Sequence, residues 1–491
     1  MPDITTLPIY PPAQERDLGD DAIPSHPLGV KPSGNALLAT YNLRDAIGQF
    51  RRLPDELIIL LLESFSGTDL LRIGRTCKAF YAFTRAEELW KALFVESHLE
   101  GFTWRGTWRS TYLNLPPSKV PMVDCSHLYS DVLYRPFNCA HIALDPYVRN
   151  IPVRNQIPRL SDLSPEDFDA DWADRPFILT EPVKAWPVYK NWSVGTLLSR
   201  YGQEKFRAEA VDWPLRTYGD YMADNADESP LYLFDRAFVP KMGLTVGQPD
   251  QTPDASYWPP ACFAEDLFSV VGSDRPDHQW LIVGPERSGS KFHKDPNATS
   301  AWNAVLRGPK YWIMFPSGDT RPPPPGVFVS DDQSEVTSPL SIAEWLLNFH
   351  AEARRKPGCM EGICGEGEIL HVPSGWWHLV VNLEASIAIT QNFIPRAHLG
   401  AALDFMLNKA DQVSGFRKNV QNPYERFVDG MRETYPNLLE QAEELRKKAE
   451  GKKRKWEDIV RGKAEGEAGD EAPEGGFSFG FGNDDSDVEV P

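Results

Sequence analysis

The feature that most constrains this chain is a histidine and a carboxylate separated by a single residue. His293 and Asp295 stand in the segment 290–296. Side chains alternate between the two faces of a β-strand, so on a strand these two groups point the same way. Far downstream, the Pro-Ser-Gly sequence at 373–375 predicts a tight turn that delivers His378 to a new strand. Two histidines and one carboxylate form the facial triad that holds non-haem Fe(II).

A His-x-Asp triplet alone is weak evidence, because many strands carry one as a plain surface pair. The flanking sequence strengthens the interpretation that this triplet belongs to a metal site. Residues 299–307 predict a strand, Gly308 and Pro309 a turn, and residues 310–316 a second strand. After His378, residues 385–393 predict a further strand. Short strands joined by turns are typical of a barrel or a jelly-roll-like double sheet.

These motifs closely resemble the JmjC (jumonji C) domain, and within it the phosphatidylserine-receptor-like group. The shared text is S-A-W-N-A, G-x-K-x-W, F-P, V-P-x-G-W-W-H and T-Q-N-F. The resemblance covers roughly residues 170–400. It implies a mainly β domain, a cupin-like double-stranded β-helix or jelly roll, that binds Fe(II) and 2-oxoglutarate. Helices are expected on both sides of this domain in the sequence.

The resemblance also implies roles for individual residues. The expected iron ligands are His293, Asp295 and His378. The expected contacts of 2-oxoglutarate are Lys310, Asn303, Thr390 and Ser290, where Ser290 replaces the threonine usual in the group and should preserve its hydrogen bond. A buried lysine is costly unless it is paired, so a ligand carboxylate gives Lys310 a reason to be buried. Asn392 shares strand parity with Thr390 and is expected to assist near the metal.

A complete set of ligands implies an active dioxygenase that converts 2-oxoglutarate to succinate and CO2 while it oxidises a C–H bond of a protein substrate. Lysyl hydroxylation is the favoured outcome, because the receptor-like motifs dominate, and N-methyl demethylation is the other. A hypothesis of a different class is a substrate adaptor of an SCF-type ubiquitin ligase, in which the β domain only binds targets. An adaptor of that kind would need neither Lys310 nor His378.

Residues 50–95 predict a separate helical module. Helices are expected from Pro54 onward, over 69–81, and over 87–94. The L-P-D-E-L start, the D-L-L-x4-T-C-K-x-F middle and the L-W-K end resemble an F-box. That resemblance implies docking onto a Skp1-type adaptor of a cullin ubiquitin ligase through Leu53, Pro54 and Leu57.

The alternative for this module is an ordinary helical subdomain that supports the oxygenase and whose leucines form its core. The run from Leu57 to Leu62 is apolar at all six positions. Six consecutive apolar residues cover every face of a helix, and a short module cannot bury all of these side chains. One side of the helix is therefore expected to meet another surface.

The remaining segments complete the predicted domain organisation. A disordered N-terminal segment is expected over 1–45, a connecting region over 96–169, C-terminal helices over 401–449 and a disordered charged tail over 450–491. Residues 317–368 separate the two halves of the metal motif, as an insert that forms either a substrate wall or a surface excursion. Within the β domain, residues 206–211 alternate like a single strand.

Composition excludes several classes of protein. The net charge of −19 gives no global basic field, so nucleic-acid binding is not indicated. No continuous apolar run approaches the length of a membrane-spanning helix, and the N-terminus does not resemble a signal peptide. The six cysteines lack a framework spacing, which favours reduced thiols in the cytosol or nucleus. Cys359 and Cys364 are expected to be loop thiols, with a zinc site as the alternative.

A nuclear location is predicted from seven lysines and arginines within residues 446–455. The alternative is a charged helix end, since basic side chains favour helix C-termini. A fluorescent fusion with these seven residues changed to alanine is expected to move from the nucleus to the cytosol, as seen by microscopy. Retention in the nucleus would show that the cluster is only a charged helix end.

Overall fold

The computed structural model describes residues 23–116, 123–318, 321–330, 336–337 and 341–448. The chain divides into two units, residues 1–434 and 435–491. In the second unit, the described residues are helical from 436 to 448. The predicted disordered tail and the basic residues 452–455 lie outside the described residues. Within the described residues, no helix is both long enough and apolar enough to span a membrane.

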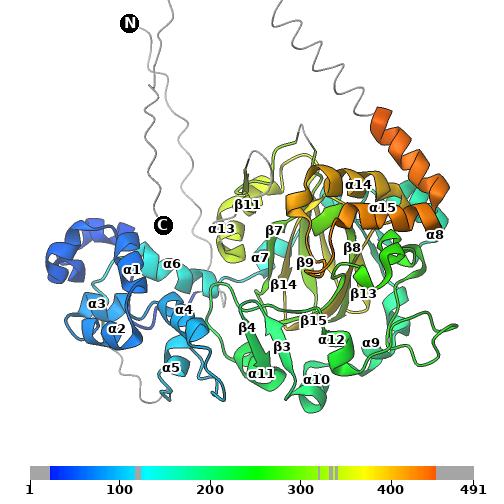
Figure 1. Ribbon diagram of the computed structural model, residues 1–491. Coiled ribbons are helices and arrows are strands. Elements are labelled where there is room, and N and C mark those ends of the chain that lie inside the picture. Colours follow the sequence, from blue (N-terminus) through cyan, green and yellow to red (C-terminus); the bar gives the residue numbers. More distant parts are fainter. Residues whose placement is uncertain (1–22, 117–122, 319–320, 331–335, 338–340, 449–491) are drawn as a thin grey trace, which may run out of the picture. The chain divides into compact units, whose positions relative to one another are not determined.

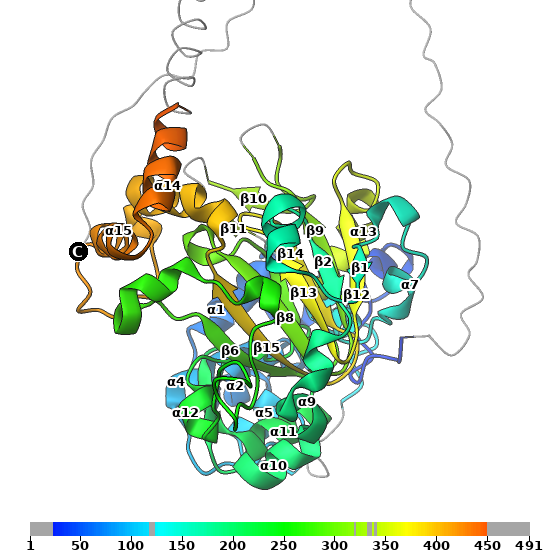
Figure 2. The same ribbon diagram turned by 90° about the vertical axis from the view of Figure 1, so that its right-hand side faces the viewer.

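Two β-sheets form the centre of the first unit (Figure 1, Figure 2). The larger sheet has nine strands in the order β1-β2-β13-β8-β15-β6-β5-β3-β4, and the smaller has four in the order β12-β9-β14-β7. The strands of the larger sheet are β1 (Arg159–Leu160), β2 (Phe177–Leu179), β3 (Lys205–Ala208), β4 (Val211–Pro214), β5 (Leu233–Asp235), β6 (Gln279–Gly284), β8 (Ser300–Arg307), β13 (Glu368–Val372) and β15 (Ser386–Phe393). Those of the smaller are β7 (Gly289–His293), β9 (Lys310–Phe315), β12 (Met360–Cys364) and β14 (Trp377–Asn382).

The chain crosses from one sheet to the other as it proceeds, which is the jelly-roll topology that the sequence predicts. β6, β8, β13 and β15 belong to the larger sheet, whereas β7, β9 and β14 belong to the smaller. One apolar cluster contains Val305 and Leu370 from the larger sheet together with Trp312 and Val380 from the smaller. The two sheets therefore pack face to face, and the predicted mainly β, cupin-like fold is confirmed.

Strand β9 is buried on both of its faces. Trp312 and Met314 belong to the cluster between the sheets. Their neighbours Tyr311 and Ile313 pack outward, in a second cluster with helix α13 (Ile342–Ala353). Because alternate side chains take opposite faces, Lys310 points to the same inner side as Trp312. A short β10–β11 hairpin (Phe328–Val329, Val336–Thr337) lies between β9 and α13 in the sequence.

The N-terminal module is helical, as predicted, but its second helix is broken. Its helices are α1 (Asp55–Glu63), α2 (Gly67–Ile73), α3 (Lys78–Phe83) and α4 (Glu87–Ser97). The single helix predicted over 69–81 is wrong, because Gly74 ends α2 and Cys77 is fully extended before α3. A side chain at Gly74 would bring a Cβ atom to 2.5 Å from the Thr84 hydroxyl oxygen, so the close approach of this turn requires glycine.

Aromatic side chains hold this module against the β domain. Trp108 of α5 (Trp108–Tyr112) contacts Phe94 of α4, Trp213 of β4 and Tyr221 of α11 (Leu215–Ala223). The Trp108 indole nitrogen donates to both oxygens of Asp227, at 2.9 Å.

Ion pairs join helix α6 (Asp131–Ala140), in the connecting region after the module, to later segments of the chain. Arg135 of α6 pairs with Glu228 at 2.7 Å and with Glu344 at 2.6 Å. Helix α4 of the module, through the contact of Phe94 with Trp213, and the following helices α5 and α6 thus all contact the β domain and its surrounding segments. The other helices of the first unit are α7 (Asp145–Val148), α8 (Pro165–Asp167), α9 (Pro187–Asn191), α10 (Val194–Tyr201), α12 (Phe238–Met242), α14 (Leu399–Asn408) and α15 (Pro423–Thr434).

Two further expectations differ from the structure. The strand predicted over 206–211 is wrong, since Ala208 pairs with Val211 across a two-residue turn and the segment belongs to two strands. In the sequence, apolar and polar residues alternate through both turn residues, Glu209 and Ala210, so the pattern does not reveal the turn, although both of these side chains are exposed in the structure. In the N-terminal segment, residues 23–45 are ordered rather than disordered. Lys31 bridges Tyr129 there and Val30 is buried, in extended chain and 3-10 turns that leave no periodic signature.

Candidate active site

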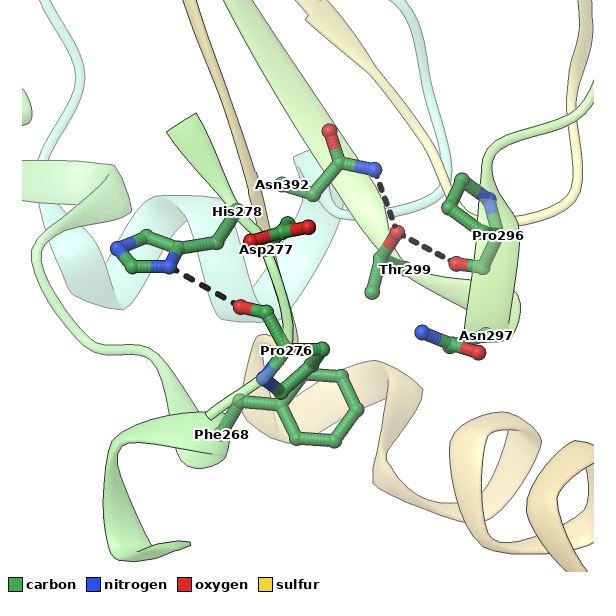
Figure 3. Close-up of a pocket in the computed structure, with 8 residues that line it drawn as sticks. All are labelled: Phe268, Pro276, Asp277, His278, Pro296, Asn297, Thr299 and Asn392. Atoms are coloured by element: carbon green, nitrogen blue, oxygen red, sulfur yellow. Dashed lines mark hydrogen bonds between the residues drawn. The ribbon is translucent and has the colours of Figure 1, made fainter. Parts of the chain in front are cut away.

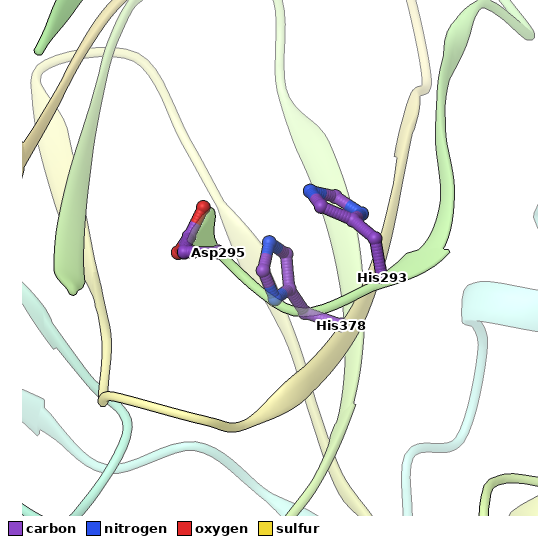
Figure 4. A group of neighbouring side chains, drawn as sticks. All are labelled: His293, Asp295 and His378. Atoms are coloured by element: carbon purple, nitrogen blue, oxygen red, sulfur yellow. The ribbon is translucent and has the colours of Figure 1, made fainter. Parts of the chain in front are cut away.

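The structure brings the three predicted iron ligands together (Figure 4). The ligand atoms of His293, Asp295 and His378 all lie within 4.8 Å of one another. His293 ends β7 and sits directly opposite His378 of β14 in the antiparallel ladder. Asp295 follows in the loop after β7, where the residue is half-buried and its Oδ2 atom is inaccessible to solvent. Among the described residues this is the one group of three or more ligand-type side chains so arranged.

Hydrogen bonds fix the tautomer of both imidazoles. The Nδ1 atom of His293 lies 2.7 Å from the carbonyl oxygen of Lys291, and Nδ1 of His378 lies 3.0 Å from that of Trp376. A carbonyl oxygen can only accept, so each Nδ1 carries the proton and donates it. Each Nε2 is therefore left with a lone pair, the form in which histidine binds a metal.

Burial sets the charges at this centre. It lowers the pKa of His378 well below the usual value, with a further contribution from His293, so this imidazole is neutral. Burial also raises the pKa of Asp295, against the opposing effects of His293 and of a hydrogen bond from the Asn392 amide. The Oδ2 atom of Asp295 has no hydrogen-bond partner in the described part of the chain. A divalent cation satisfies a carboxylate in this position, and the donor set fits Fe(II).

Lys310 lies deeper between the sheets and is fully buried. Its ammonium group donates to the Tyr232 hydroxyl at 2.9 Å and to the Asn382 amide oxygen at 2.6 Å. Both partners are uncharged, and no carboxylate of the described residues contributes to its electrostatics. Burial lowers the pKa of Lys310 to about 7. A buried cation without a counter-charge is unfavourable, and the carboxylate of a bound ligand would supply that counter-charge.

The strand register relates the lysine to the metal group. On β14, His378 pairs with Met314, and Asn382 pairs with Lys310. Met314 and Lys310 are four residues apart on β9, so the two pairs are separated by about 13 Å along the strand. A small dicarboxylate can occupy the space between them, with its far carboxylate at Lys310. The residues present therefore fit 2-oxoglutarate as well as iron.

The other predicted contacts lie on the same inner surface. Asn303 and Thr390 are paired across β8 and β15, and both are buried. The Thr390 hydroxyl donates to the Trp302 carbonyl at 2.8 Å, whereas the amide oxygen of Asn303 has no partner among the described residues. Ser290 is half-buried on β7, where a bulge between the His378 and Val380 pairs brings it opposite Val380. Asn392 donates to the Thr299 hydroxyl at 2.9 Å.

Sequence reasoning missed the two neutral partners of Lys310. Asn382 carried a usable signal, because it lies four residues after His378 on the same strand and therefore shares its face. Tyr232 carried none, since it precedes Lys310 by 78 residues and stands just before β5. Only the pairing of β5 with β6 brings it to the lysine.

Comparisons with known proteins agree with this geometry. A family model described as a cupin-like domain matches residues 246–398, and one described as F-box-like matches residues 50–96. The chain is 38% identical to the arginine-specific demethylase JMJ22 of Arabidopsis thaliana, in an alignment that covers 89% of this chain and 87% of that protein. It belongs to the JmjC family. Fe(II) and 2-oxoglutarate, the predicted cofactors, are those of the JmjC oxygenases, and the chain is an enzyme of this class.

Two more JmjC relatives align over shorter stretches. The bifunctional arginine demethylase and lysyl-hydroxylase psr-1 of Caenorhabditis elegans is 33% identical over 49% of this chain and 62% of its own length. The 2-oxoglutarate and iron-dependent oxygenase JMJD4 of Danio rerio is 30% identical over 30% of this chain and 32% of its own length.

The cysteines of this JmjC protein do not form a metal site in the described residues. Cys359 and Cys364 are buried free thiols at opposite ends of β12, and neither belongs to a group of metal ligands. The expectation that both are loop thiols is wrong for Cys364. It pairs with Lys310 in the ladder, because the segment between the two cysteines forms the edge strand beside β9.

Lys310→Met is expected to leave metal binding intact and to weaken 2-oxoglutarate binding by roughly 100- to 5,000-fold, because loss of a buried counter-charge costs about 3–5 kcal/mol. Isothermal titration of the metal-loaded protein measures this affinity. Lys205→Met, at an exposed ion pair, is the matched control. An unchanged affinity in Lys310→Met would show that another cation holds the far carboxylate.

The same contact should depend on pH. The proton on Lys310 is lost as pH rises through about 7. The wild-type affinity for 2-oxoglutarate should therefore fall above that pH by up to about tenfold per pH unit, because binding must then take up a proton. The residual affinity of Lys310→Met should lack this dependence.

Proposed function

We propose that this JmjC enzyme oxidises side chains of other proteins and is delivered to them through a ubiquitin-ligase adaptor. The observation that carries the catalytic part is the pairing of two features on one inner surface. One is the group of His293, Asp295 and His378, and the other is the uncompensated charge of Lys310. A decayed site used only for binding would have no need of either.

Bound Fe(II) and 2-oxoglutarate supply O2 activation, and the chain's own residues prepare their places. The two histidines present neutral Nε2 atoms, and Asp295 presents an oxygen free of other partners. Lys310 would hold the far carboxylate of 2-oxoglutarate, with Asn303 and Thr390 on the same inner surface. The apolar cluster between the sheets keeps water from the reacting atoms.

The proposed substrate is a lysine or arginine side chain of a protein. Lysyl hydroxylation is the outcome that the receptor-like motifs favour, and psr-1 is named for both this reaction and arginine demethylation. The name of JMJ22, which aligns along most of the chain, favours N-methylarginine demethylation. Both reactions begin with oxidation of a C–H bond in a cationic side chain, and both consume O2 and 2-oxoglutarate with release of succinate and CO2.

The purified protein with Fe(II), ascorbate and 2-oxoglutarate is expected to release succinate, and Asp295→Ala should abolish this release because two ligands do not hold the iron against water. The exposed Asp212→Ala variant is the control. Mass spectrometry of candidate proteins separates the outcomes, since hydroxylation adds one oxygen atom and demethylation removes one methylene unit. Binding of iron and 2-oxoglutarate without any succinate from candidate substrates would favour the adaptor hypothesis.

The proposed partner of the F-box-like module is a Skp1-type adaptor. Helix α1 buries Ile58, Ile59 and Leu62, but Leu57, Leu60 and Leu61 remain 46%, 61% and 39% exposed. Exposed leucines on one helix face indicate an interaction surface. Of the predicted contacts, Pro54 and Leu57 are exposed, whereas Leu53 is half-buried and packs against the apolar cluster that includes the buried residues of the module. Nuclear residence of the complex, directed by residues 446–455, is part of the proposal.

Leu57→Glu combined with Leu60→Glu is expected to abolish recovery of a Skp1-type adaptor in a pull-down, because two carboxylates would be buried in an apolar contact. Stability should change little, since both side chains are exposed. Leu407→Glu, at a leucine of α14 that is 43% exposed, is the matched control. Full recovery by the double variant would leave the module with only its supporting role.

A further inference from the structure

The loop that carries Asp295 has an unusual backbone. Asn297 and Ala298, which follow it directly after Pro296, have φ angles of 56° and 52°. Side-chain-bearing residues rarely adopt this left-handed region, asparagine more readily than most. Two such residues in succession persist only where surrounding contacts impose the conformation.

Asn297 has those contacts, and they come from a segment more than a hundred residues away. Its amide nitrogen donates to the Ser414 carbonyl oxygen at 2.9 Å, and its amide oxygen accepts the Ser414 backbone N–H at 3.0 Å. Only the backbone of Ser414 takes part. The Asn297 side chain is buried, whereas Ser414 is exposed, so the pair is shielded from water on the asparagine side.

The same loop is held at two more points. The Ala298 carbonyl accepts a hydrogen bond from the Ser374 hydroxyl at 2.6 Å, and Ser374 belongs to the turn that leads to His378. The Thr299 hydroxyl donates to the Pro296 carbonyl and accepts from the Asn392 amide (Figure 3). Asn392 also donates a hydrogen bond to Asp295. Gly415, next to Ser414, accepts from the Asp277 backbone N–H at 2.9 Å.

We propose that Asn297 is a positioning residue of the metal centre, and that its reciprocal hydrogen bonds with the backbone of Ser414 fix the loop in which Asp295 meets the iron. The segment between α14 and α15 thereby controls metal affinity without touching the metal. This inference rests on the proposed function, because it assigns Asp295 as an iron ligand. It requires that loss of the Asn297 side chain act through Asp295 and not through general unfolding.

The test is a titration of the metal-free protein with Co(II), followed by the visible absorption of the bound ion. Asn297→Gly keeps the left-handed backbone accessible and deletes both hydrogen bonds. It is expected to raise the Kd for Co(II) by roughly 10- to 100-fold, the size of effect found for groups that orient metal ligands. Asn297→Asp keeps the acceptor for the Ser414 N–H but loses the donor, so its Kd should fall between those of wild type and Asn297→Gly.

Two controls separate positioning from stability. Ser414→Ala should bind Co(II) like wild type, because its side chain has no part in the contact. Asn422→Gly replaces an exposed asparagine with a φ of 50° and should also be neutral. Wild-type affinity in Asn297→Gly, with wild type itself binding Co(II), would overturn the positioning role alone. Failure of wild type to bind Co(II) would overturn the metal assignment and the inference together.

Discussion

The register of β14 between β7 and β9 is the constraint on which the site depends. It sets His378 opposite His293 on one side and Asn382 opposite Lys310 on the other. A slip of one residue would turn every side chain of β14 to the other face, which for His378 means the apolar layer beneath α13. That layer and the cluster between the sheets are both closely packed, so the register is specified from two sides at once.

Much of this site could be predicted because its parts are local in sequence. His293 and Asp295 share one short segment, His378 follows a Pro-Ser-Gly turn, and Lys310 heads a strand after a Gly-Pro turn. The contacts that could not be predicted join residues that are far apart in the sequence. Tyr232 contacts Lys310 because strand pairing brings the two together. Asn297 is hydrogen-bonded to the backbone of Ser414, so the residue type at position 414 gives no sign of the contact. The broken second helix of the module was missed because apolar residues keep a helical spacing past Gly74. The β3–β4 hairpin was missed because apolar and polar residues alternate in the sequence through Glu209 and Ala210 of its turn.

The helical module has a face for each of the two roles that the sequence left open, support of the β domain and the proposed docking of a partner. Its α4 side is joined to the β domain by a cluster of aromatic rings and by the indole–carboxylate contact of Trp108 with Asp227. Its α1 side carries the exposed leucines. A partner on α1 would therefore be attached to the oxygenase through a packed interface rather than through a flexible linker. The separation between that partner and the active site would be set by the fold.

The exposed leucines of α1 also have a consequence for the abundance of the protein in the cell. When its partner is scarce, an exposed apolar face binds chaperones and promotes self-association. If the proposed adaptor binds here, synthesis of this chain in excess of that adaptor would produce unbound molecules that quality control removes. The amount of oxygenase in the cell would then follow the supply of the adaptor, whatever the rate at which the oxygenase itself is made.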